Sequence, residues 1–123
     1  MAQANVGVYE KVLSATDIAQ KMSVPIHWVE GERRLLPTPI PGVPVVLPVR
    51  DQKGNDTTLR LARSQREPYF MSKEWRALVD AYDLKKGDRV YFWWEGNFLR
   101  VKVRTSPYKI MLFGVCIGVR ING

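Results

Sequence analysis

The sequence predicts a mainly β fold, in which seven short strands close wholly or partly into a barrel with two helices inserted between them. Short runs of alternating polar and apolar residues recur along the chain, separated by turn-forming residues. So many strands in 123 residues would leave exposed edges unless the sheet curls round on itself. Hydrophobic residues make up 46% of the chain, and 4 Trp, 5 Tyr and 4 Phe supply enough apolar surface for a core. We therefore expect one domain over residues 1–123, with its core at about residues 8–119.

In the N-terminal half, the first strand is expected over residues 8–13, where VYEKVL alternates before the turn-prone SATD. A polar bend over residues 14–23 follows, and Pro25 can open a short helix that runs to Glu30, because proline is tolerated in a first helical turn. Prolines then punctuate residues 35–51, which excludes a helix and confines any strand over residues 45–49 to a sheet edge. We expect a stiff loop that leads into an edge strand.

The middle of the chain predicts a hairpin followed by a helix. Residues 51–56 (DQKGND) form a turn around Gly54, and residues 57–61 (TTLRL) alternate as its returning strand. A polar link over residues 63–68 and a short strand over residues 69–71 come next. The segment SKEWRALVDAY (72–82) is expected to be helical, with Ser72 as its N-cap. Its apolar residues recur at i, i+3, i+4 and i+7 and form one face: Trp75, Leu78, Val79 and Tyr82.

Three more strands are expected in the C-terminal third. A turn at Gly87 and Asp88 begins an aromatic strand that ends in YFWW, and the tight connection EGN (95–97) leads into FLRVKVR (98–104). In FLRVKVR the apolar residues alternate with a basic stripe, which is typical of the water-facing side of a strand. The stripe consists of Arg100, Lys102 and Arg104. A final strand is expected over about residues 108–119.

The charge of the chain favours a polyanionic partner. Lys and Arg number 19 against 12 Asp and Glu, a formal net charge of +7, which suits nucleic acid or an anionic membrane surface. No stretch approaches the roughly 18 consecutive apolar residues of a membrane span. The N-terminal sequence also lacks the basic start and apolar run of a secretory signal, so we expect a cytosolic or nuclear protein.

Catalytic and metal-binding signatures are poor. A single cysteine, Cys116, excludes an internal disulfide framework, and with one histidine, His27, the chain has no plausible zinc or iron ligand set. No nucleophile-and-base, phosphate-loop or dinucleotide motif is present. Two Asp-x-Lys triplets (51–53 and 83–85) resemble the carboxylate and lysine pair of some nucleases, but both fall in turns, where such residues are ordinary. We expect no enzymatic activity and no cofactor.

Two short loops carry the donor groups that DNA recognition needs. Residues 20–23 offer amide, ammonium and hydroxyl donors, and residues 63–66 place four polar donors in succession between two strands, although a solvated loop would have a similar composition. Arginine can fork onto guanine O6 and N7, and glutamine onto adenine N6 and N7, while basic side chains neutralise phosphates. The candidate residues are Gln20, Lys21, Met22, Ser23, Arg63, Ser64, Gln65 and Arg66.

The order of these segments resembles a known family. The opening YEKVLSATDIAQKMSVPI, the turn DQKGND before TLRL, and above all YFMSKEWRALVDAYDLKKGDRVYFW are similar to the plant B-three DNA-binding domain of auxin-response and abscisic-acid-insensitive transcription factors. The last motif is the most specific, and the resemblance covers about residues 9–104. The positions that carry it are Tyr69, Trp75, Leu84, Gly87, Asp88 and Phe92.

The resemblance implies a seven-stranded open pseudobarrel with two short α-helices, whose two loops grip the major groove of DNA in the nucleus. By position the first loop would be residues 14–23 and the second residues 62–68, the same two donor-rich loops. The first loop lacks the Lys-Leu-Asn-Arg run of the best-known members and the second lacks their Trp-Asn pair, so the chain resembles a divergent branch, such as the reproductive-meristem type, and no target sequence is carried over.

The leading hypothesis is therefore a transcription-regulating domain that binds double-stranded DNA, rather than a membrane or a small-molecule substrate. Further basic residues are expected to form a flanking phosphate rim: Lys11, Arg60, Lys73 and Arg104. One alternative is a protein-interaction barrel, in which the proline-rich edge or the apolar segment KIMLFGVCIGV pairs with another chain as a homo- or hetero-oligomer. A further alternative is a nuclease-associated DNA-recognition domain.

Overall fold

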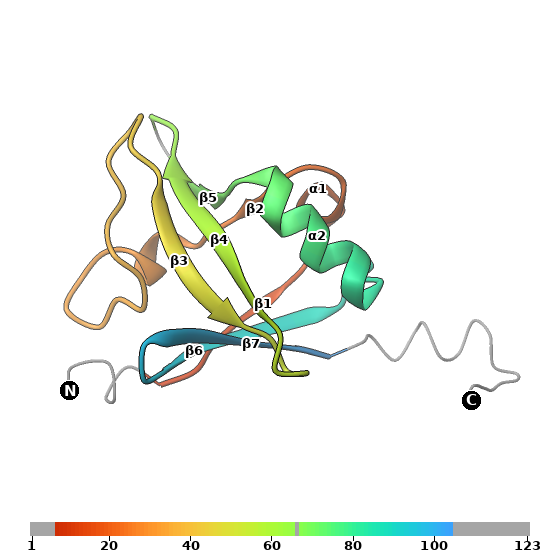
Figure 1. Ribbon diagram of the computed structural model, residues 1–123. Helices are drawn as coiled ribbons and strands as arrows, with labels where there is room; N and C mark the ends of the chain where they lie inside the picture. The colour runs from red at the N-terminus through yellow and green to blue at the C-terminus, as the bar shows by residue number, and fades with distance from the viewer. Residues whose placement is uncertain (1–6, 66, 105–123) are drawn as a thin grey trace, which may run out of the picture.

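The computed structural model describes residues 7–65 and 67–104, whose strands form one curved sheet in the order β1-β6-β7-β3-β4-β5-β2 (Figure 1). All neighbouring strands are antiparallel except β3 and β7, which are parallel. The seven strands are β1 (Tyr9–Val12), β2 (Met22–Ser23), β3 (Val45–Arg50), β4 (Asp56–Arg63), β5 (Pro68–Phe70), β6 (Arg89–Glu95) and β7 (Phe98–Arg104). Two α-helices accompany them, α1 (Ala15–Ala19) and α2 (Ser72–Tyr82), with a 3-10 helix at Ile26–Trp28.

Most of the predicted elements are confirmed. The β3–β4 hairpin pairs Val45 with Leu61 at one end and Arg50 with Asp56 at the other. The second hairpin, β6–β7, turns at residues 96–97, as the EGN connection predicts. Helix α2 covers the whole segment 72–82, because its apolar face is long enough to fix the helical period. One detail of that helix was wrong: Met71 is the N-cap, and Ser72 is the first helical residue, without a capping hydrogen bond.

The predicted polar bend over residues 14–23 is wrong in its local structure, because it contains a helix and a strand. Ser14 caps α1 through a reciprocal pair of hydrogen bonds: its hydroxyl accepts from the Asp17 N–H at 3.1 Å, and the Asp17 carboxylate accepts from the Ser14 N–H at 2.8 Å. A helix of five residues is too short to show an apolar period. The predicted helix at Pro25 is only a 3-10 turn, and the strand predicted over residues 108–119 lies outside the described residues.

The prediction that the proline-rich segment forms an edge strand is also wrong, because β3 lies between β4 and β7. Pairing with β7 begins only at Val49, opposite Leu99. Pro48 therefore lies on a part of β3 that has β4 as its single neighbour, and its missing N–H removes no bond to β7. The strand is interior at its C-terminal end and edge-like where the proline stands.

The core lies between the two halves of the curved sheet and α2. Its rings interlock: Trp28 meets Phe92 edge-on with centroids 5.5 Å apart, and Phe70 lies 5.6 Å from Phe92. The Trp75 side chain is fully buried, and its indole N–H donates to the Asp17 carbonyl at 2.7 Å. One side chain of α2 thus fixes the position of α1. No helix among the described residues is long and apolar enough to cross a membrane.

The turn between β3 and β4 is organised by the buried carboxylate of Asp51. It accepts hydrogen bonds at 2.9 Å from the backbone N–H groups of both Lys53 and Asn55. Burial by itself would raise the pKa of Asp51, but these N–H groups and the nearby Tyr82 hydroxyl stabilise the carboxylate, and the resulting pKa lies below the usual value. Because the Asp51 carboxylate accepts hydrogen bonds from the backbone of the turn, the Asp-x-Lys triplet at residues 51–53 stabilises the turn.

This lowered pKa predicts an acid-sensitive turn. A carboxylate whose pKa is lower in the folded than in the unfolded state stabilises the fold above the unfolded value, about 3.9, and that contribution is lost as the pH falls through the folded value. We expect the free energy of unfolding of Asp51→Asn to depend less on pH than that of the wild type below about pH 5. Urea unfolding at several pH values measures this, and parallel pH profiles for the two proteins would contradict it.

Candidate nucleic-acid interface

The two donor-rich loops lie side by side because the strands that end them are paired. We call residues 14–23 the first arm and residues 64–67 the second arm. The first arm ends in β2 and the second leads into β5, and these strands pair Met22 with Phe70 and Ser23 with Tyr69. One more backbone bond, from the Val24 N–H to the Pro68 carbonyl at 3.0 Å, extends the junction. The sheet therefore fixes the spacing of the two arms.

Lys21 joins the arms at the surface. Its ammonium group lies 4.0 Å from the centroid of the Tyr69 ring, a cation–π contact between the first arm and β5. A hollow of about 550 Å³ opens at this junction, and residues of both arms line it: Lys21, Ser64, Gln65, Glu67 and Tyr69. Side chains separated by more than 40 positions thus share one polar hollow.

The second arm is a tight turn with Gln65 at its exposed tip. The Ser64 N–H donates to the Glu67 carbonyl at 3.0 Å, and the Ser64 hydroxyl accepts from the Glu67 N–H at 3.2 Å. Strand β4 continues through Arg63, so this arm is shorter than the predicted range 62–68. Arg66 lies outside the described residues.

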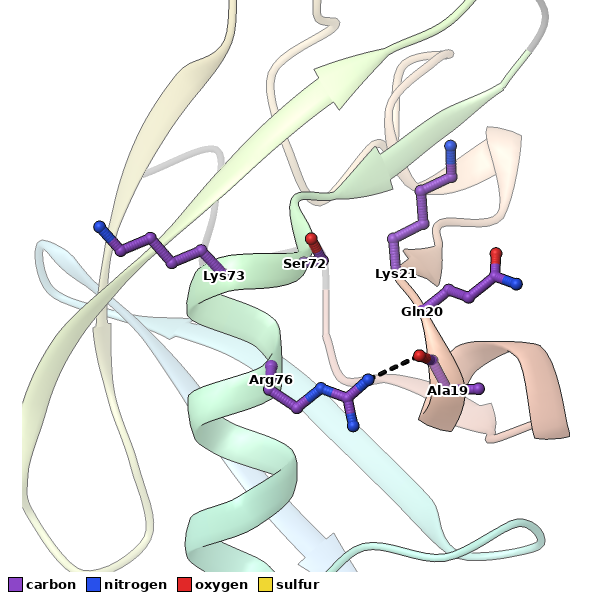
Figure 2. Close-up of a pocket in the computed structure, with 6 residues that line it drawn as sticks. All are labelled: Ala19, Gln20, Lys21, Ser72, Lys73 and Arg76. Atoms are coloured by element: carbon purple, nitrogen blue, oxygen red, sulfur yellow. Dashed lines mark hydrogen bonds between the residues drawn. The ribbon is translucent and has the colours of Figure 1, made fainter.

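A second hollow, of about 580 Å³, lies between the end of α1 and the start of α2. Figure 2 shows Gln20 and Lys21 on the α1 side and Ser72, Lys73 and Arg76 on α2, with the Lys21 and Lys73 chains extending in different directions from the rim. The Arg76 guanidinium donates to the Ala19 carbonyl at 2.6 Å, which ties the two helices together. The first N–H groups of α2 have no partner within the helix, and they add positive potential at this wall.

Sequence reasoning missed Ser72 and Arg76 as members of this surface. Arg76 lies one helical turn after Lys73 on the exposed side of α2, opposite the buried Trp75 face. The spacing of Lys73 and Arg76 in the sequence could have predicted that both lie on this surface. The packing of α1 against the start of α2 could not have been predicted, because α1 itself was not.

Three of the predicted contact residues hold the first arm from within. Met22 is completely buried, so it is a core residue rather than a surface contact. The Lys11 ammonium bonds the Asp17 carboxylate at 3.1 Å and the Ser23 hydroxyl at 2.8 Å, and it also donates to the Ser23 carbonyl. Asp17 in turn accepts from the Ser23 N–H at 3.1 Å. This Lys11–Asp17–Ser23 cluster closes the arm on itself.

The other predicted basic contacts are neutralised or remote. The Arg60 guanidinium pairs with Glu74 at 2.9 Å, and that of Arg63 pairs with Glu30 at 3.2 Å. Arg104 lies at the end of β7 and lines neither hollow of the arms. By contrast, neither Lys21 nor Lys73 has a carboxylate within ion-pair distance in the described part of the chain.

Within residues 7–65 and 67–104, no cluster of His, Cys, Asp and Glu side chains could hold a metal ion. His27 is exposed and stacks on Tyr9 with ring centroids 5.9 Å apart, so its position is that of a surface residue. Cys116 lies outside the described residues. The surface formed by the two arms and the start of α2 offers hydrogen-bond donors and cations.

Comparison with known proteins identifies the family. No family model matches the sequence. However, the B3 domain-containing protein At1g08985 of Arabidopsis thaliana is 33% identical over 89 residues, which cover 71% of this chain and 86% of that protein. The chain belongs to the B3 domain family. This is the B-three family that the motif over residues 69–93 indicates.

Two solved structures share the fold of this B3 domain. The hypothetical Arabidopsis thaliana protein At1g16640.1 is 15% identical, with a TM-score of 0.59 over 82% of this chain and 92% of that one. The protein of the Arabidopsis FUS3–DNA complex is 17% identical, with a TM-score of 0.63 over 80% of this chain and 96% of that one. The predicted seven-stranded open pseudobarrel with two helices is therefore confirmed.

The Lys11–Asp17–Ser23 cluster predicts a large stability loss on Asp17→Ala. The substitution leaves the Lys11 ammonium, which is mostly buried, without its counter-charge, and it leaves two N–H groups without an acceptor. We expect the free energy of unfolding to fall by about 3 kcal/mol. Urea unfolding followed by tryptophan fluorescence measures it.

The matched control is Asp56→Ala, which removes an exposed carboxylate that pairs with Arg50 at 2.6 Å. Water screens this pair, so the midpoint of unfolding is expected to change little. Equal effects of the two substitutions would show that the Asp17 cluster does not hold the arm.

Proposed function

We propose that this B3 domain is a nuclear, non-enzymatic module that binds double-stranded DNA through its two arms and regulates transcription. The observation that carries the proposal is the shared hollow at the junction of the arms, where Lys21 lies over Tyr69 and Gln65 lines the same hollow. Family membership supports it, as does the likeness in fold to the protein of the Arabidopsis FUS3–DNA complex.

Phosphate binding is assigned to Lys21, Lys73 and Arg76 at the hollow between α1 and α2. Lys21 and Lys73 carry charges that no carboxylate of the described residues neutralises, and the start of α2 adds the partial positive charge of its N–H groups. Such contacts fix the register of a protein on the duplex without reading its sequence. Arg76 is already anchored to Ala19, so its remaining N–H groups are held in place for a phosphate oxygen.

Base reading is assigned to the arm tips, where Gln20 and Gln65 are exposed. A glutamine amide can bond adenine N6 and N7 together in the major groove. The Glu67 carboxylate, which lines the same hollow as Gln65, is able to accept from cytosine N4. The arms therefore carry base-reading groups beside phosphate-binding groups.

The same arms are poorly suited to an anionic membrane. Loops and helices that bind a bilayer insert large apolar side chains below the headgroups. The exposed residues of the arm tips are polar: Gln20, Lys21, Ser64 and Gln65. A nucleic-acid duplex offers both the phosphates and the base edges that these side chains can bond.

Salt dependence tests the phosphate contacts. Fluorescence anisotropy of the full chain with a labelled random duplex should show affinity falling steeply with rising NaCl, and Lys73→Ala should reduce the slope of log affinity against log salt by about one. The control is Lys86→Ala, an exposed lysine beyond the opposite end of α2, which should leave the slope unchanged. Affinity that does not respond to salt would contradict DNA binding itself.

Selection of bound duplexes from a random library tests the base contacts. Gln65→Ala is expected to relax the preference at one or two positions and to cost about 1–3 kcal/mol on the preferred site, while binding to random duplex is kept. Asn97→Ala, which removes an exposed amide from the β6–β7 turn, is the control. If Gln65→Ala and the wild type select the same sequences with equal affinity, the second arm does not read bases.

A further inference from the structure

A third hollow, of about 540 Å³, lies on the sheet formed by β1, β6 and β7. It shares no residue with the two hollows of the arms, and in Figure 1 these strands lie on the opposite side of the barrel from the tip of the second arm. The residues that line it are Val8, Tyr91, Trp93, Lys102, Val103 and Arg104. We call this surface the outer face.

The outer face exposes apolar side chains around its hollow. Along β6, Val90 and Phe92 are buried on the core side, while Tyr91 and Trp93 alternate with them and are only half-buried. Val8, which precedes β1 and lines the hollow, is 61% exposed, and Val12 at the far end of β1 is 48% exposed. Exposed apolar side chains that gather at a hollow with a polar rim are typical of a binding site for another molecule.

The rim of the outer face has an unbalanced positive charge. Its two carboxylates are already paired, Glu10 with Arg89 and Glu95 with Arg100. Lys102 and Arg104 are exposed, and neither has an ion-pair partner among the described residues. The surface therefore complements a partner that brings carboxylates together with apolar groups.

The geometry favours a peptide over a nucleic-acid strand. Base stacking needs an open aromatic face, but the Arg100 guanidinium lies over the Trp93 ring, 5.9 Å from its centroid. The hollow spans residues of both β6 and β7, so an extended peptide that lies across these strands presents alternate side chains to it.

We infer that the outer face binds an acidic peptide segment of a partner protein. An aliphatic or aromatic side chain of the peptide fills the hollow beside Tyr91 and Trp93, and its carboxylates pair with Lys102 and Arg104. The inference does not depend on DNA binding, and a peptide bound there leaves both arms uncovered.

The test uses the full chain and a fluorescein-labelled peptide of twelve residues in which glutamates alternate with leucine and phenylalanine. Fluorescence anisotropy is expected to show saturable binding, and Lys102→Glu is expected to weaken it at least about fivefold through charge reversal. Lys86→Glu, the same change at a distant exposed lysine, should alter it less than about twofold. Val8→Asp, at an exposed position, should weaken it by a similar factor to Lys102→Glu.

Peptide controls separate the two components of recognition. Replacement of the leucines and phenylalanines by serine should remove binding, as should replacement of the glutamates by lysine. Random duplex binding should be the same for Lys102→Glu and the wild type, so failure of this inference and failure of DNA binding are distinguishable.

The inference would be overturned if peptide binding did not saturate, or if Lys102→Glu and Lys86→Glu weakened it equally. It would also be overturned if a single-stranded oligonucleotide bound in place of the peptide with the same sensitivity to Lys102→Glu, or if light scattering showed self-association that Lys102→Glu abolishes. Protection of residues 105–123 from hydrogen exchange that Lys102→Glu removes would assign the hollow to this chain's own residues and would also overturn it.

Discussion

The pairing of β2 with β5 is the constraint on which the arms depend. Strand β2 has only two residues to pair with β5, and a pair of strands so short cannot persist without support. The support comes from buried neighbours: Met22 inserts into the core, while the Lys11–Asp17–Ser23 cluster binds the strand to α1. The Trp75 indole then anchors α1 to α2 through the Asp17 carbonyl. The spacing of the hydrogen-bond donors on the two arms is thus fixed by contacts with the buried core.

A second constraint is the division of the basic side chains between structural and exposed positions. Arg60 and Arg63 point toward carboxylates of α2 and of the loop after the 3-10 helix, so their charge is neutralised within the fold. Lys11 is used in the same way. The cations at the hollows, Lys21 and Lys73, lack such partners among the described residues. Part of the basic charge is therefore neutralised within the fold, while cations without a carboxylate partner among the described residues remain at the hollows of the arms and on the outer face.

The elements that the sequence predicts correctly are those with a long period or a defined turn. Helix α2 shows four apolar residues on one face, and each hairpin has alternation on both sides of a glycine turn. Helix α1 and β2 escape prediction because five residues span little more than one helical turn and two residues a single strand repeat, so no pattern can recur within them. The same limit affects the site: Gln20 to Ser23 are four consecutive polar or flexible side chains, and only the register of β2 shows that Met22 points inward while Lys21 points out. Pairing between distant segments, such as Arg63 with Glu30, carries no local signal at all.

The proline-rich segment and the outer face show how one curved sheet separates two surfaces. Strand β3 joins the β4–β5–β2 half, which carries the arms, to the β7–β6–β1 half through only two residue pairs with β7. Pro48, which cannot donate to a ladder, lies just before those pairs and limits the parallel contact to the end of the strand. The sheet is therefore able to bend over the core at the junction of β3 and β7. This bend places the arms on one side of the domain and Tyr91 and Trp93 on another. A β-strand presents alternate residues to opposite faces, so substitutions on the outside of β6 and β7 do not change the buried residues of the core that support the arms. The surface of the arms and the outer face are therefore free to vary independently.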